Sequence, residues 1–154
     1  MTPSGEQLKH DHRVIDEGFA RFVAAARAGR WETTALTEAI RRLRVHIWVE
    51  EEIYFPPLRA AGVIGPIMVM LKEHGLIWSY LEALEFLANE GSDLPRALSV
   101  WEDLATVLDA HNSKEETILY VTGDRILQTD ISDQVAVGLD SDVPTGWSSA
   151  MATI

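Results

Sequence analysis

The chain has 154 residues, no cysteine and a formal net charge of −11. This acidic balance argues against nucleic-acid binding, which needs clustered lysine and arginine side chains. The lack of cysteine excludes disulfides, thiolate zinc sites and iron–sulfur clusters, so any metal must be held by His, Asp and Glu. No stretch reaches the ~18 apolar residues of a membrane helix, and the N-terminus has no apolar signal core, so we expect a cytoplasmic protein without a membrane partner.

Segments with the apolar periodicity of amphipathic helices are residues 5–28, 33–55, 65–90 and 94–120. Ser4 is the expected N-cap of the first segment, and Pro56-Pro57 should end the second. Strand signals are poor. Short connections between consecutive helices favour antiparallel neighbours, which predicts an all-α, up-down-up-down antiparallel four-helix bundle.

The character of the chain changes at Gly123. From there to the C-terminus it contains five Asp and one Arg, together with Gly, Ser and Thr. We therefore predict a bundle domain over residues 1–122 and an acidic, Gly- and Ser-containing C-terminal tail over residues 123–154. Within the tail, Ile126, Leu127 and residues 135–139 are candidates for packing on the bundle. The remainder is expected to be mobile and dispensable for the functional site.

One histidine lies on the apolar stripe of each predicted helix. His12 continues the stripe of the first helix at spacings of four and three residues. His10 is turned from it by roughly 200° and should face outward. We compared the position of each His, Asp and Glu with the apolar stripe of its predicted helix in the same way. The residues of metal-ligand type that lie on a stripe, and should therefore face inward, are His12, His46, Glu50, His74, His111 and Glu115.

These residues should also meet at one level of the bundle, because their distances from the connecting turns match to within a few ångströms. A lone inward histidine is often a hydrogen-bonded core residue. Two inward carboxylates with no Lys or Arg on the stripes are costly unless a cation pairs with them. The set therefore predicts a metal site.

The spacing of the two His-x-x-x-Glu pairs fits a dinuclear site. His and Glu at i and i+4 point the same way, so a carboxylate can bridge two cations while each imidazole terminates one. This donor set predicts two non-haem iron ions, with zinc or manganese as alternatives. Ferritin-like bundles use Glu-x-x-His pairs, and no histidine here has a glutamate three residues before it, so that family is excluded.

The pieces KHDHRVI, HIWVEEEIYFPPL, GPIMVMLKEHGLI and HNSKEETILY resemble the hemerythrin family in its bacterial HHE cation-binding branch, over about residues 6–121. The resemblance implies a four-helix bundle around two irons, bridged by two carboxylates and a solvent-derived oxygen. It also implies a range of roles, because members are variously linked to oxygen binding, nitric oxide and peroxide responses, iron handling and repair of damaged iron centres.

The sequence departs from the oxygen-carrying hemerythrins, which use five histidines and have His-x-x-x-His on the third helix. Here the positions four residues from His74 are Met70 and Trp78. With four histidines, each iron would keep an open position, which suits reaction with a small ligand better than reversible oxygen carriage. Other carboxylates that could fill the gap are Glu51, Glu73 and Glu116.

The leading hypothesis is therefore a non-haem di-iron protein that binds or reacts with a small diatomic or peroxide ligand: oxygen, peroxide or nitric oxide. Peroxide- or oxygen-reducing enzyme activity is one form of this hypothesis. The alternatives are an iron-handling or iron-centre repair protein, and a metal-state sensor acting through an unidentified protein partner. Beside the site, Tyr54 and Trp78 are expected to be core residues, whereas Glu51 and Glu52 should be solvated by helical phase.

Overall fold

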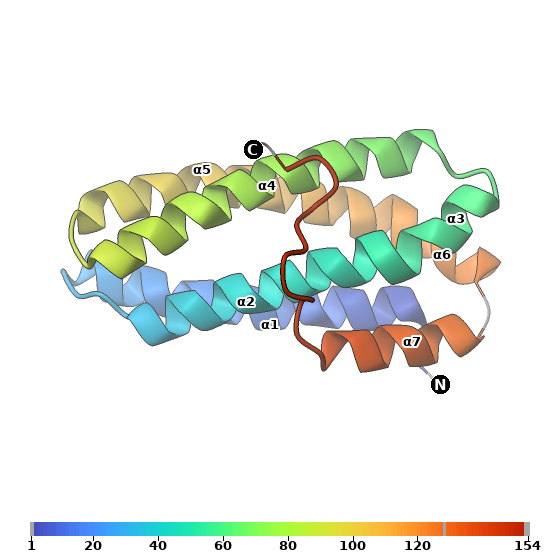
Figure 1. The fold of residues 1–154 in the computed structure, drawn as a ribbon, viewed down its shortest axis with the longest axis horizontal. Helices are drawn as coiled ribbons and strands as arrows, with labels where there is room; N and C mark the ends of the chain where they lie inside the picture. Colours follow the sequence, from blue (N-terminus) through green and yellow to red (C-terminus); the bar gives the residue numbers. More distant parts are fainter. Residues whose placement is uncertain (1, 128, 153–154) are drawn as a thin grey trace.

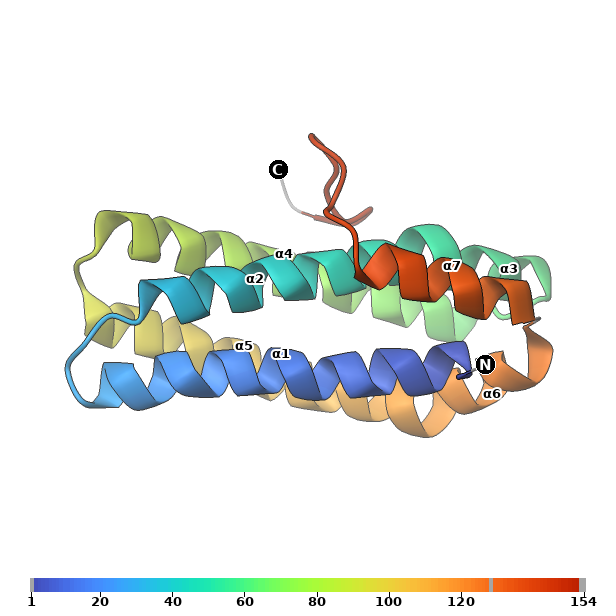
Figure 2. The same ribbon diagram turned by 90° about the horizontal axis from the view of Figure 1, so that it is seen from below.

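The computed structural model describes residues 2–127 and 129–152. Within them, four helical rods pack side by side, and the chain runs in opposite directions along consecutive rods (Figures 1 and 2). The elements are α1 (Ser4–Arg27), α2 (Thr33–Val49), η1 (Glu50–Tyr54), α3 (Phe55–Ala60), α4 (Gly65–Glu90), α5 (Leu94–Lys114), η2 (Glu115–Leu119), α6 (Tyr120–Ile126) and α7 (Thr129–Leu139). The prediction that the chain is an all-α helical bundle is confirmed.

Local signals account for the end of α4 and the start of α5. Gly91 adopts a left-handed conformation, with φ of 65°, directly after α4, which a residue with a side chain rarely does. Asp93 caps α5 by accepting a hydrogen bond from the backbone N–H of Arg96 at 3.2 Å. The predicted cap at Ser4 is wrong: this serine is the first residue of α1, and its hydroxyl lies 3.4 Å from that of Ser132.

Two helices continue past the ends predicted for them. The rod that begins with α2 includes the five-residue π-helical turn η1 and then α3, where Pro56 and Pro57 lie in the first turn. Proline is tolerated there because the first N–H groups of a helix have no acceptor within it. The rod that begins with α5 likewise passes through the π-helical turn η2 and ends at Ile126, beyond the predicted end at residue 120.

The core consists of two apolar clusters with a polar layer between them. One cluster, which includes Phe19, Phe22 and Leu84, fills the half of the bundle nearer the α1–α2 and α4–α5 connections. The other, which includes Leu8 and Leu58, fills the opposite half. The histidines and glutamates of the stripes lie between these clusters, so apolar side chains limit the access of water to them.

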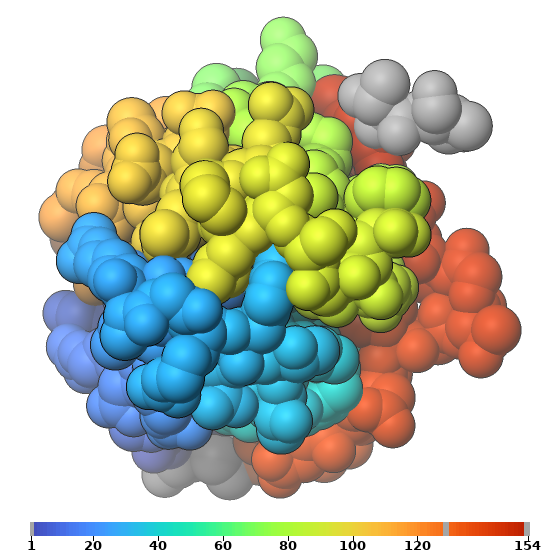
Figure 3. All heavy atoms as spheres, turned by 90° about the vertical axis from the view of Figure 1, so that its left-hand side faces the viewer, coloured from blue at the N-terminus to red at the C-terminus, as the bar shows by residue number. Residues whose placement is uncertain are grey.

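The segment predicted as a mobile tail packs on the bundle. Helix α7 contacts α1 and α2, and Val135 is fully buried, as expected for the apolar residues 135–139. Residues 140–152 cross α2 and reach α4 (Figure 1), and they form part of the red surface on one side of the end view (Figure 3). The domain boundary after residue 122 stays a prediction. None of the helices in the described ranges is long and apolar enough to cross a membrane.

Candidate metal centre

The structure brings all the predicted ligand residues together in one buried layer. Each of them is at most 3% exposed. Their donor atoms form two overlapping groups, and within each group the atoms lie within 4.8 Å of one another. One group consists of Glu50, His74, His111 and Glu115, and the other of His12, His46 and Glu115. Glu115 is thus shared between two pairs of histidines.

Each of these histidines is held from behind by a carboxylate at its Nδ1 atom. The pairs are Asp11 with His46 at 2.8 Å, Glu51 with His74 at 2.8 Å, Glu73 with His111 at 2.9 Å, and Glu116 with His12 at 2.8 Å. A carboxylate in this position accepts the Nδ1–H, which fixes the tautomer whose Nε2 atom is free to bind a cation. The Nε2 atoms all lie 3.2–3.4 Å from a carboxylate oxygen of Glu50 or Glu115.

The four supporting carboxylates form a closed ring around the bundle, because each bonds the histidine of the next rod. Asp11 and Glu73 precede a ligand residue by one position, on α1 and α4. Glu51 and Glu116 follow a ligand residue by one position, on the two rods that run the other way. One residue is a rotation of about 100° on a helix, and reversing the chain reverses its sense. All four carboxylates therefore turn the same way around the bundle.

The expectation that Glu51 is solvated is wrong, since its side chain is 4% exposed. The sequence also suggested Glu51, Glu73 and Glu116 as additional metal ligands. In the structure these carboxylates instead contact the Nδ1 atoms of the histidines, on the side that faces away from the centre of the layer. Asp11 was not recognised at all. The sequence does contain a signal for these supporting carboxylates. Each of them is the neighbour in sequence of an inward-facing candidate ligand residue, and a residue in that position points toward the adjacent helix.

Unpartnered acceptor atoms in the layer show that its donor set fits a cation. Among the described residues, no hydrogen-bond partner is in place for Glu50 Oε1, His74 Nε2 or Glu115 Oε2. These atoms are buried, and a buried polar atom without a partner is costly. Imidazole nitrogens and carboxylate oxygens that converge at this spacing are ordinary ligands of iron, zinc or manganese.

Without a cation, protons must balance the charge of the layer. Although burial lowers it, the hydrogen bond and negative charge of Glu115 raise the pKa of His12 to about 9. The pKa of His74 is also raised, against the effect of burial, by the neighbouring carboxylates of Glu115, Glu50 and Glu51. Burial and the charge of Glu115 raise the pKa of Glu50. His12 is therefore protonated at neutral pH in the metal-free layer, and a cation that binds there would displace this proton.

A π-helical turn begins at each of the two glutamates of the layer. In η1 the N–H of Phe55 bonds the carbonyl of Glu50, and in η2 the N–H of Tyr120 bonds the carbonyl of Glu115. Each turn adds one residue relative to an α-helix, so the residue five positions after the glutamate comes onto the same face. Ile118, three residues after Glu115, is consequently 57% exposed, whereas Tyr120 is buried.

The two residues placed by these turns make the halves of the layer different. The Tyr120 hydroxyl donates to Glu50 Oε2 at 2.7 Å and lies 3.3 Å and 3.4 Å from the Nε2 atoms of His12 and His46. At the equivalent position, the ring of Phe55 stacks on His74, with centroids 5.7 Å apart. Burial and the charges of Glu115 and Glu50 raise the pKa of Tyr120, so its hydroxyl is a neutral donor. Tyr120 was not predicted from the sequence as a residue of this layer.

Tyr120→Phe should weaken metal binding in the His12–His46 half by about tenfold to a hundredfold, the usual effect of removing a supporting contact. The phenyl ring keeps the packing, so the fold should be retained. Competition with a chelator would measure the change in affinity. Tyr54→Phe is the matched control, because Tyr54 is equally buried but its hydroxyl lies against Gly123. Equal affinities for wild type and Tyr120→Phe would contradict the assigned role.

Three further predictions concern residues around the layer. His10 is exposed, as helical phase predicted. Tyr54 and Trp78 are both buried core residues, also as expected. Trp78 packs edge-on against Trp147, with centroids 5.5 Å apart, and lies under the guanidinium of Arg44.

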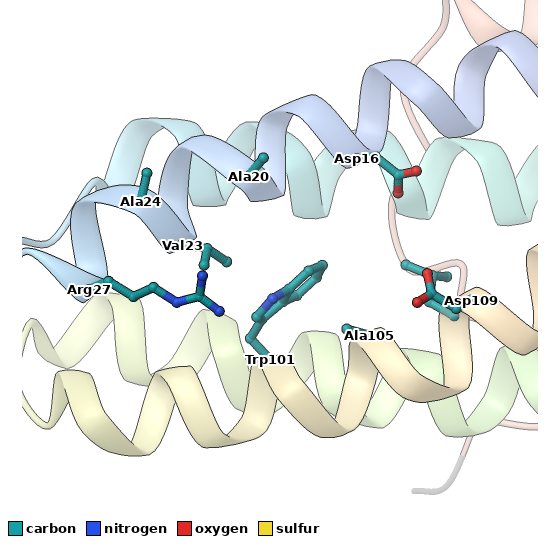
Figure 4. Close-up of a pocket in the computed structure, with 9 residues that line it drawn as sticks. Asp16, Ala20, Val23, Ala24, Arg27, Trp101, Ala105 and Asp109 are labelled. Atoms are coloured by element: carbon teal, nitrogen blue, oxygen red, sulfur yellow. The ribbon is translucent and has the colours of Figure 1, made fainter.

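A groove of about 390 Å³ between α1 and α5 lies beside the His12 half of the layer. Asp16, one turn after His12, and Asp109 project into it from opposite walls, while Trp101 forms part of its apolar lining (Figure 4). Burial, together with the charges of Asp109 and Glu116, raises the pKa of Asp16. Negative charge is therefore concentrated at the end of the groove next to His12, while Arg27 lines its other end (Figure 4).

Comparisons with known proteins agree with this geometry. A family model described as the hemerythrin HHE cation-binding domain matches residues 5–122. Uncharacterized proteins of Mycobacterium tuberculosis and Mycobacterium bovis are 32% identical to the chain over 110 residues, which is 71% of this chain and 65% of theirs. The chain thus matches slightly less than two thirds of the length of these relatives. No solved structure matched the chain. The family match and the buried His/Glu layer together identify the chain as a member of the hemerythrin family with an HHE cation-binding domain.

Proposed function

We propose that this protein holds two non-haem iron ions and that its centre binds or reacts with oxygen, peroxide or nitric oxide. The observation that carries the proposal is the overlap of the two donor groups at Glu115. In this assignment His12 and His46 would hold one ion, His74 and His111 would hold the other, and Glu50 and Glu115 would be shared between the two. The bound iron would supply redox chemistry toward the small ligand.

The residues of the chain prepare this centre in three ways. The ring of carboxylates orients the imidazoles and raises their basicity as ligands. The apolar clusters on both sides keep bulk water from the layer, which strengthens the electrostatic interactions within it. The Tyr120 hydroxyl, whose oxygen lies 2.7 Å from Glu50 Oε2, holds a proton within the layer.

Oxygen should oxidise the ferrous protein irreversibly. The layer has four imidazoles and no fifth histidine, so each ion would keep a position that oxygen or peroxide could occupy, whereas an oxygen carrier must protect such a position. Ferrous protein prepared without oxygen would be mixed with oxygen and followed by optical spectroscopy. We expect a stable ferric spectrum that argon does not reverse. A spectrum that argon bleaches and air restores would place the protein among oxygen carriers.

Iron handling is a second candidate function, because the acidic groove at Asp16 and Asp109 would attract cations to the His12 half of the layer. In this case the iron is the cargo. Rapid transfer of iron from the loaded protein to a metal-free acceptor, at a rate that Asp16→Asn and Asp109→Asn reduce together, would favour it. Iron that stays bound while oxygen or peroxide is consumed would favour the first function.

A further inference from the structure

The residues after α7 fold back over the outer face of the His74 half of the layer. The indole of Trp147 packs against Trp78 and donates to Glu52 at 2.9 Å. The carbonyl of Met151 lies so close to α4 that a Cβ added to Gly75 would be 2.2 Å from its oxygen. We call residues 147–151 the C-terminal clasp. The clasp packs closely over Gly75, the residue directly after His74, so it occupies a specific position on α4 that requires a glycine there.

The clasp also holds a carboxylate that supports the layer. The Ser149 hydroxyl donates to Glu51 Oε2 at 2.5 Å, and the Ala150 N–H donates to Glu51 Oε1 at 2.8 Å. The same Oε2 atom accepts from His74 Nδ1 at 2.8 Å. Ser149 itself is 3% exposed. A continuous chain of hydrogen bonds therefore links the clasp, through Glu51, to the imidazole of His74.

Two other carboxylates of the ring are paired with a cationic side chain, whereas Glu51 is bound by neutral donors of the clasp. Arg42 pairs with Asp11, and Lys114 pairs with Glu73. For Glu51, two neutral donors of the clasp take the place of such a cation. Because they bind both oxygens, they set the orientation of the carboxylate, and because they are neutral, they leave its negative charge to act on His74.

We propose that the C-terminal clasp is a positioning element of the metal centre, which fixes Glu51 so that His74 is held toward the cation of the His74–His111 half. The inference rests on the proposed metal binding. It predicts that loosening the clasp speeds the release of one cation and leaves the other unaffected. Docking of residues that lie far from the ligands in sequence would thus govern the retention of metal in half of the site.

The test uses the full chain loaded with cobalt(II), whose release to a chelator is followed by its visible spectrum. Ser149→Ala removes one donor. Ala150→Pro removes the other, because proline has no N–H. Proline suits this position, the second residue of a turn closed by the bond from Ala152 N–H to the Ser149 carbonyl at 3.0 Å. The double variant should release one of two cobalt populations about tenfold faster. Ser148→Ala, at an exposed neighbour, is the matched control.

Two further variants separate positioning from general loss of structure. Gly75→Ala should reproduce the faster release, because its methyl group displaces the clasp without touching Glu51. Glu51→Gln should release the same population faster on its own. In that background the clasp substitutions should then have no additional effect, whereas a merely structural role would add to it.

The outcomes for the two proposals are distinct. Wild-type protein that binds no cobalt would overturn the metal function and the clasp with it. Wild-type protein that binds cobalt, with release unchanged in the double variant and in Gly75→Ala, would overturn the clasp alone. Equal acceleration of both populations would also overturn it, because the contact reaches His74 and not the other half of the layer.

Discussion

Replacing Glu115 by glutamine should abolish metal binding in both halves of the layer. Glu115 is the residue shared by the two donor groups, and its Oε1 lies 3.2 Å from the Nε2 atoms of both His12 and His111. Glutamine keeps the size of the side chain but not the charge that a bridging ligand supplies. After loading with iron and removal of excess metal, elemental analysis should find less than about a tenth of the wild-type content.

The controls for this substitution lie beside it in the sequence and on the surface. Glu116→Gln changes the supporting carboxylate of His12 and should weaken metal binding by about tenfold to a hundredfold without abolishing it. His10→Ala removes an exposed imidazole and should leave the metal content intact. Full metal content in Glu115→Gln would remove the bridging assignment, and loss of metal in His10→Ala would show that His10 takes part in the site.

Removing the metal should produce a protein whose stability falls as the pH rises above neutrality. The pKa of His12 is raised in the folded chain from 6.5 to about 9. A raised pKa stabilises the folded state fully below the unfolded value, and this contribution is lost as the pH passes through the folded value. Between pH 6.5 and 9.5 the loss should be on the order of 3 kcal/mol for this buried group.

Urea unfolding of the metal-free and zinc-loaded proteins at several pH values measures this effect. The zinc-loaded protein should lose much less stability over the same range, because the cation takes over the role of the protons. His10→Ala provides the control for removal of a histidine outside the layer. A metal-free protein with the same free energy of unfolding at pH 6.5 and pH 9.5 would show that His12 is not protonated in the layer.

The inward position of the candidate ligand residues was predictable because each of them lies where ordinary α-helical phase applies. His12 and His74 are in uninterrupted helices, and Glu50 and Glu115 are the first residues of the π-helical turns. Counting from the preceding apolar residues therefore placed all of them inward. The bundle followed from the same periodicity and from the short connections.

The prediction failed where that phase ends. Beyond Glu115 the added residue turns Ile118 outward and Tyr120 inward, and no local propensity in EETILY indicates a π turn. The contacts of the C-terminal segment were missed for a different reason. Its polar composition resembles that of an unattached tail, and its attachment depends on Glu51 and on the backbone space at Gly75, which belong to distant parts of the chain.

The π-helical turns also bear on how relatives of this chain should be compared. Such a turn is equivalent to one residue inserted into an α-helix. A relative without the turn after its second His-x-x-x-Glu motif would present its fourth residue beyond the glutamate, not its fifth, to the metal layer. An ungapped alignment would then pair Tyr120 with a residue that faces solvent, and would hide the presence or loss of this hydroxyl during evolution. Placing the gap within residues 115–119 restores the correspondence between side chains that share one location in space.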